Sequence, residues 1–181
     1  CSCFREYIRQ TDSLLQNSEE NRNKNMTDIK SMTKDELKNL KKEFWESFSA
    51  YCEVQPYLRG RHKVWTMYNT KVKGVELKFD VNRNGVAVVL EVNHRQEEQR
   101  LEMYEKLTWY KENLEKDFPD GLIWDVCYIR EMGNQVARIY CQKTGIDFHR
   151  RTDWGEFFSY MARQMYLLER NFMKIAAYVR E

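Results

Sequence analysis

Three charged side chains lie in two neighbouring segments where polar and apolar residues alternate, and their types suit metal-dependent phosphodiester cleavage. Asp80 and Glu91 could hold Mg²⁺ through hard oxygen ligands. Lys78 could stabilise the charge that develops on a phosphate. These three are the candidate catalytic residues, Asp80 and Glu91 are the candidate metal ligands, and the expected cofactor is either none or Mg²⁺. The same alternation is what an antiparallel hairpin with one solvated face requires, and this plainer interpretation, with a Lys78–Glu91 ion pair, is favoured.

The element that must position these residues is a hairpin over Glu76–Asn93. Asn84-Gly85 is a strong signal for a type I′ turn between two alternating strands. The pairs that this turn predicts are Arg83 with Val86, Phe79 with Leu90, and Lys78 with Glu91. In that register the two carboxylates share one face, one pleat step apart, within reach of one ion.

Bulk properties restrict the class of protein. The chain has 181 residues, 42% of them hydrophobic, and its 30 basic and 28 acidic residues leave a net charge of +2. That balance gives no overall attraction to nucleic acid or lipid. Five cysteines without C-x-x-C spacing support neither a zinc site nor a disulfide framework. No apolar run is long enough to span a bilayer, so we expect a globular, soluble, cytoplasmic protein that does not enter a membrane.

Periodicity along the chain predicts an α+β fold in the order α-β-β-α-β-β-α. Capping boxes at Thr33 and Asp153 mark two helix starts. The expected elements are a helix from 33 to about 56, the hairpin of 76–93, a helix over 95–118, strands over 122–129 and 135–142, and a helix from 153 onward. Consecutive hairpins favour a mostly antiparallel four-stranded sheet covered by helices. We expect one domain over 33–181, preceded by a poorly ordered or helical tail over 1–32.

A second group of side chains could bind nucleic acid. Basic residues near aromatic ones can hold phosphates and stack bases. The candidates are Arg59, Arg61, His62, Lys63, Arg150 and Arg151. Because these clusters are short and the net charge is small, a solvated loop surface is the favoured alternative.

Several segments together resemble a bacterial family of unknown function. The segments are 63–70, 77–81 and 87–92, with the spaced residues Tyr104, Leu107, Leu114 and Trp124. The family is common in Bacteroidetes and is associated with restriction-type proteins. It is remotely similar to the restriction-endonuclease-like PD-(D/E)xK fold, whose nucleases carry an Asp on one strand and Glu-x-Lys on the next.

Carried onto this chain, the resemblance places the Asp at Asp80, the Glu at Glu91 and the Lys position at Asn93. The motif lysine is therefore missing, and Lys78 could only stand in for it from another strand. The resemblance implies a non-catalytic or degenerate restriction-endonuclease-like module that binds DNA, RNA or a protein partner. The alternatives are a Mg²⁺-dependent nuclease and a pure protein-interaction module.

Overall fold

Four strands form one antiparallel sheet, as the two consecutive hairpins in the sequence predict. The computed structural model describes residues 32–60 and 70–180. In the sheet, the strands lie in the order β1-β2-β4-β3, and every neighbouring pair is antiparallel. Their bounds are Val75–Asn82 for β1, Gly85–Val92 for β2, Ile123–Ile129 for β3 and Gln135–Thr144 for β4. The expected α+β class and four-stranded antiparallel sheet are confirmed.

Four α-helices accompany the sheet in the described residues. They are α2 (Lys34–Glu53), α3 (Glu97–Thr108), α4 (Lys111–Leu114) and α5 (Trp154–Arg180), with the short 3-10 helices η1 (Pro56–Leu58) and η3 (Arg151–Asp153). The chain divides into two compact units, residues 1–42 and 43–181, and each is described by itself. None of the described helices combines the length and the apolar surface needed to cross a bilayer.

The helix termini agree only partly with the sequence. The capping box of Thr33 and Glu36 is present, because each side chain accepts a hydrogen bond from the other's backbone N–H. At the start of α5, the Asp153 carboxylate instead accepts the N–H of Asp147 at 2.9 Å, and Glu156 pairs with Lys143. The second capping box was therefore a wrong prediction, although the helix begins where it was expected.

The prediction of a single helix over 95–118 is also wrong. The helical segment is broken after Thr108 into α3 and α4. Tyr110 leaves helical geometry with φ −110° and ψ 24°, and the helix resumes at Lys111. Helical spacing alone did not reveal this break, because apolar residues continue at similar intervals on both sides of it.

The register of the first hairpin differs from the prediction. Gly85 pairs with Asn82, so the turn residues are Arg83 and Asn84, and Lys78 lies opposite Val89. The expected pairs are therefore absent, and the turn is not of type I′, because neither of its two central residues has a positive φ. The reason is β4, whose Lys143 carbonyl comes so close that a Cβ on residue 85 would lie 2.0 Å from it. Glycine is therefore required inside the strand and not at the turn.

Replacing Gly85 with alanine should destabilise the fold by about 2–4 kcal/mol, because the new Cβ collides with backbone and the φ of +151° is unfavourable for alanine. The matched control is Gly133→Ala in the other hairpin. Gly133 has a similarly unfavourable φ of +83° with nothing within 4 Å, so it should lose only about 1 kcal/mol. Urea denaturation measures both; equal losses would contradict the close approach of β4.

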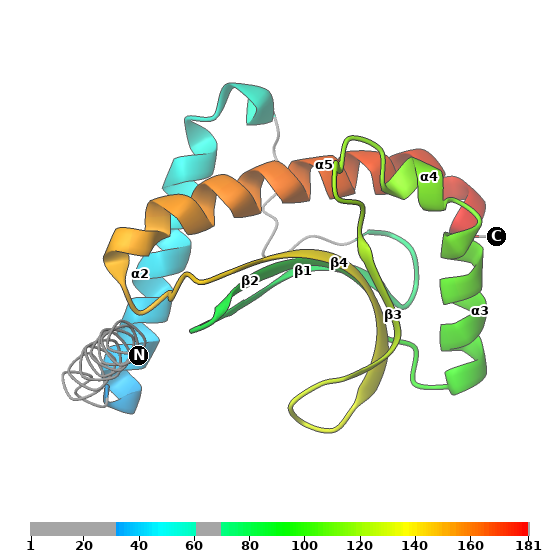
Figure 1. Cartoon of the computed structure of the whole chain (residues 1–181), viewed down its shortest axis with the longest axis horizontal. Coiled ribbons are helices and arrows are strands. Elements are labelled where there is room, and N and C mark those ends of the chain that lie inside the picture. Colours follow the sequence, from blue (N-terminus) through cyan, green and yellow to red (C-terminus); the bar gives the residue numbers. More distant parts are fainter. Residues whose placement is uncertain (1–31, 61–69, 181) are drawn as a thin grey trace, which may run out of the picture. The chain divides into compact units, whose positions relative to one another are not determined.

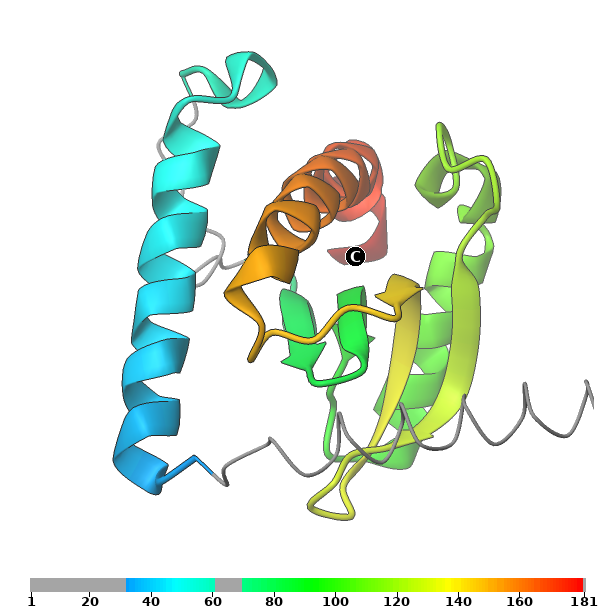
Figure 2. The same ribbon diagram turned by 60° about the vertical axis from the view of Figure 1, so that its left-hand side comes forward.

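The sheet is strongly curved, and its convex face carries the core. In residues 43–180, α5 runs along this face and α3 lies against it at the β3–β4 end (Figures 1 and 2). From α2, the Phe48 ring reaches Phe79 at 5.4 Å on the same face. Buried side chains of this face include Leu77, Val88, Leu90, Val92, Ala137 and Ile139. The concave face is left uncovered by any helix of these residues.

Candidate functional site

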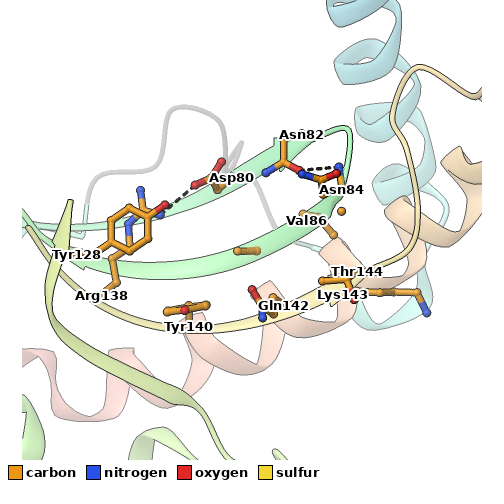
Figure 3. A pocket seen from close by; sticks show the side chains of 12 residues that line it. Asp80, Asn82, Asn84, Val86, Tyr128, Arg138, Tyr140, Gln142, Lys143 and Thr144 are labelled. Carbon is orange, nitrogen blue, oxygen red and sulfur yellow. Dashed lines mark hydrogen bonds and ion pairs between the residues drawn. The ribbon is translucent and has the colours of Figure 1, made fainter. Parts of the chain in front are cut away.

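The concave face brings Asp80 and Glu91 to a single guanidinium. Arg138 of β4 lies directly opposite Glu91 of β2 in the sheet register. Its Nε donates to Glu91 Oε2 at 2.9 Å, and its Nη1 donates to Asp80 Oδ2 at 2.9 Å (Figure 3 shows the bond to Asp80). The two candidate carboxylates therefore do share a face, and one arginine side chain joins them.

The second oxygen of Glu91 is bound by two further cations. Lys78 Nζ donates to Oε1 at 3.0 Å, and Arg130 from the β3–β4 turn donates to the same oxygen. The expected Lys78–Glu91 pair is therefore present, although these residues are diagonal neighbours. We call Lys78, Asp80, Glu91, Arg130 and Arg138 the guanidinium cluster.

Glu91 is fully buried and stays ionised. Its side chain is 0% exposed. Burial acts to raise the pKa of Glu91, but the hydrogen bonds from Arg130 and Lys78 outweigh this effect and hold the pKa below its usual value. Likewise, burial acts to lower the pKa of Arg138, and its bonds to Asp80 and Glu91 raise it above the usual value. The cluster is a set of charges that hold one another ionised.

Tyr128 covers the exposed side of this arrangement. An irregularity in β3 between Asp125 and Tyr128 shifts the strand register. The guanidinium of Arg138 lies over the Tyr128 ring, 3.7 Å from its centroid (Figure 3). Such stacking suits the weakly hydrated guanidinium and leaves the Arg138 side chain only 6% exposed.

This arrangement does not fit a bound Mg²⁺. The Arg138 guanidinium lies between the two carboxylates that would have to bind the ion, and Glu91 has no exposed oxygen. Among residues 32–60 and 70–180, no three His, Cys, Asp or Glu side chains are grouped so that they could hold a metal. No reaction step through a metal follows from these residues.

Beside the guanidinium cluster the concave face contains a polar hollow of about 150 Å³. Its floor includes the small residues Gly85 and Ala87 of β2. We use the name "polar hollow" for this space, which is lined by Asn82, Asn84, Ala87, Tyr140, Gln142 and Thr144, with Asp80 and Arg138 at one end (Figure 3).

A family model matches residues 40–176 of this chain, and its description is "Domain of unknown function (DUF4268)". The chain belongs to this family. The matched range contains the whole sheet and nearly all of α5. Comparison with the curated proteins and with the solved structures gave no match. The expected membership of a family of unknown function is confirmed, whereas the link to restriction-type proteins stays a prediction.

The described basic candidates of this DUF4268 chain, Arg59, Arg150 and Arg151, lie away from the guanidinium cluster of the concave face. Arg150 pairs with Asp153 at 2.8 Å and Arg151 pairs with Glu43, both near the start of α5. Arg59 lines a different hollow with Tyr166. Arg59 and Arg151 are also far from each other. Arg151 contacts Trp154, whereas Arg59 lies beside Tyr166, which is twelve residues or about 18 Å further along α5. The remaining candidates, Arg61, His62 and Lys63, lie outside the described residues.

Sequence reasoning missed Arg130, Arg138 and Tyr128 in this DUF4268 domain. Arg138 is one polar residue in an alternating strand, and only its pairing with Glu91, 47 positions earlier, gives it a partner. An isolated arginine flanked by apolar residues, in Val136-Ala137-Arg138-Ile139, was the one available signal. A buried arginine requires a carboxylate partner, and that requirement could have directed attention to Asp80 and Glu91.

Proposed function

We propose that this domain is a non-catalytic, degenerate member of the restriction-endonuclease-like group that binds nucleic acid on its concave face. The observation that supports the loss of catalysis is the Arg138 guanidinium, which binds both Asp80 and Glu91. In the motif that the resemblance implies, a metal would take that position. Asn93 at the motif's lysine position supports the same conclusion.

Two partly exposed cations on the concave face support a polyanionic ligand. The guanidinium cluster has three cations and two carboxylates, so it has an excess of one positive charge. The side chains of Lys78 and Arg130 are 31% and 30% exposed, and therefore accessible to a phosphate. Glu76 and Asp125 lie on the same face in the row of Glu91, on the side away from the polar hollow. A phosphate chain would follow the cations and leave those acids to one side.

The full chain should bind a labelled oligonucleotide at low salt, with an affinity that falls steeply as salt rises. Replacing Lys78 with alanine should weaken binding about 3- to 10-fold for every sequence and reduce the salt slope by about one unit. Lys78→Arg should restore most of the loss because it keeps the charge. Fluorescence anisotropy across a salt series measures these effects.

The matched control is Lys174→Ala, which removes an exposed lysine of α5 and leaves the concave face unchanged. Its affinity should equal that of the unmodified chain. Urea denaturation of Lys78→Ala verifies that the variant is folded, since Glu91 keeps its two arginines. No binding at low salt, or an equal loss in Lys174→Ala, would remove the proposal.

A Mg²⁺-dependent nuclease is the second candidate, because Asp80, Glu91 and Lys78 do lie on one face. The Asp80 side chain is 36% exposed, unlike that of Glu91. Plasmid nicking by the purified chain with Mg²⁺, stopped by Asp80→Asn, would favour this candidate over the non-catalytic one.

A further inference from the structure

Small residues create the polar hollow at one end of the concave face. Ala87 is flanked by Asp80 on β1 and Gln142 on β4, and Gly85 is flanked by Asn82 and Thr144. Two neighbouring rows of the sheet therefore have almost no side chain in the middle strand. Polar side chains from β1 and β4, the two strands that flank β2, stand around the resulting recess (Figure 3).

Hydrogen-bonding groups around the polar hollow are available to a ligand. In the described part of the chain, the side-chain amides of Asn84 and Gln142 and the hydroxyl of Thr144 make no hydrogen bond, while Asn82 accepts the backbone N–H of Asn84. Each amide offers two donors and an acceptor. Such a mixture matches the edge of a nucleobase, whereas a phosphate presents acceptors only.

The position of the polar hollow beside the guanidinium cluster suits one nucleotide. Tyr140 lines the hollow and supplies an aromatic surface on which a base can stack. Lys78 is two residues before Asp80 on the same face of β1, about 7 Å along the strand. A phosphate at Lys78 would therefore place its base over the hollow.

We infer that the polar hollow binds one unpaired nucleobase, so that the domain selects single-stranded over duplex nucleic acid. This inference rests on the proposed function and specifies its ligand. In a duplex the hydrogen-bonding edge of each base is already paired, so Asn84 and Gln142 would have no partner there. Single-stranded recognition works by stacking and by reading such free edges.

The test measures the affinity of the full chain for a labelled dT12 strand, a duplex of the same length and a 12-unit abasic strand, at one salt concentration. The abasic strand keeps the phosphates and lacks the bases. We expect dT12 to bind at least about tenfold more tightly than the other two, as one stacked and hydrogen-bonded base implies.

Variants separate the polar hollow from the phosphate contacts. Gln142→Ala and Asn84→Ala should weaken dT12 binding several-fold and leave the abasic strand unchanged, whereas Lys78→Ala should weaken both. Both substituted side chains are exposed, so the folded domain should tolerate them. Equal affinity for dT12 and the abasic strand would overturn the inference while the proposed function stands. Absence of binding to all three probes would overturn both.

Discussion

Replacing Arg138 with methionine should destabilise the folded domain by about 3–5 kcal/mol. The Arg138 side chain is 6% exposed, and its guanidinium binds Asp80 and the fully buried Glu91. Methionine has a similar length and no charge, so Glu91 would lose the cation on its Oε2 while remaining out of water. Glu91 keeps its bonds to Lys78 and Arg130 at Oε1, so the expected loss of stability comes from the unpaired Oε2 atom alone.

Urea denaturation measures this loss, and three variants delimit its cause. Arg138→Lys should lose about half as much, because an ammonium keeps the charge but cannot reach two carboxylates in fixed geometry. Glu91→Leu combined with Arg138→Met should lose less than the sum of the single changes, since no buried charge is left uncompensated. Lys174→Ala should change stability by less than about 0.5 kcal/mol. A loss below about 1 kcal/mol for Arg138→Met would show that the guanidinium cluster does not hold the three strands together.

Truncating Phe44 to alanine should lower the free energy of unfolding by about 3–5 kcal/mol. The Phe44 ring is 1% exposed and lies in a group of aromatic rings from the start of α5. Its centroid is 5.4 Å from that of Trp154, 5.6 Å from Phe157 and 5.1 Å from Phe158. Alanine would leave a cavity and remove several edge-to-face contacts.

The control for this prediction is Trp109→Ala, which removes a larger ring that is 69% exposed. It should cost less than about 0.5 kcal/mol, because little apolar surface is lost from the core. Phe44→Leu should lose less than half as much as Phe44→Ala, since it refills most of the cavity. Equal effects of Phe44→Ala and Trp109→Ala in urea denaturation would mean that this part of α2 does not pack on α5.

The elements of the fold follow from local patterns, and their interruptions do not. Period-2 alternation predicted β1 and β2, the turn residues around Gly133 predicted the hairpin of β3 and β4, and the Thr33 capping box predicted the start of α2. The break at Tyr110 lies within one continuous helical pattern, so its cause has to come from packing that the pattern does not contain. The expected turn at Asn84-Gly85 failed for a similar reason. The glycine is needed where β4, a strand outside this hairpin, comes close to the backbone of residue 85.

The amino-acid sequence by itself determined which side chains share a face. Alternation separates apolar from polar side chains within each strand, and because the apolar sets of both strands must enter one core, Lys78, Asp80 and Glu91 are left together on the other face. Only the tertiary structure decided what those side chains contact. Pairing of β2 with β4 places Arg138 opposite Glu91 across 47 positions of sequence. Such pairing depends on the packing of the whole sheet, and for this reason two candidate metal ligands became the partners of one buried guanidinium.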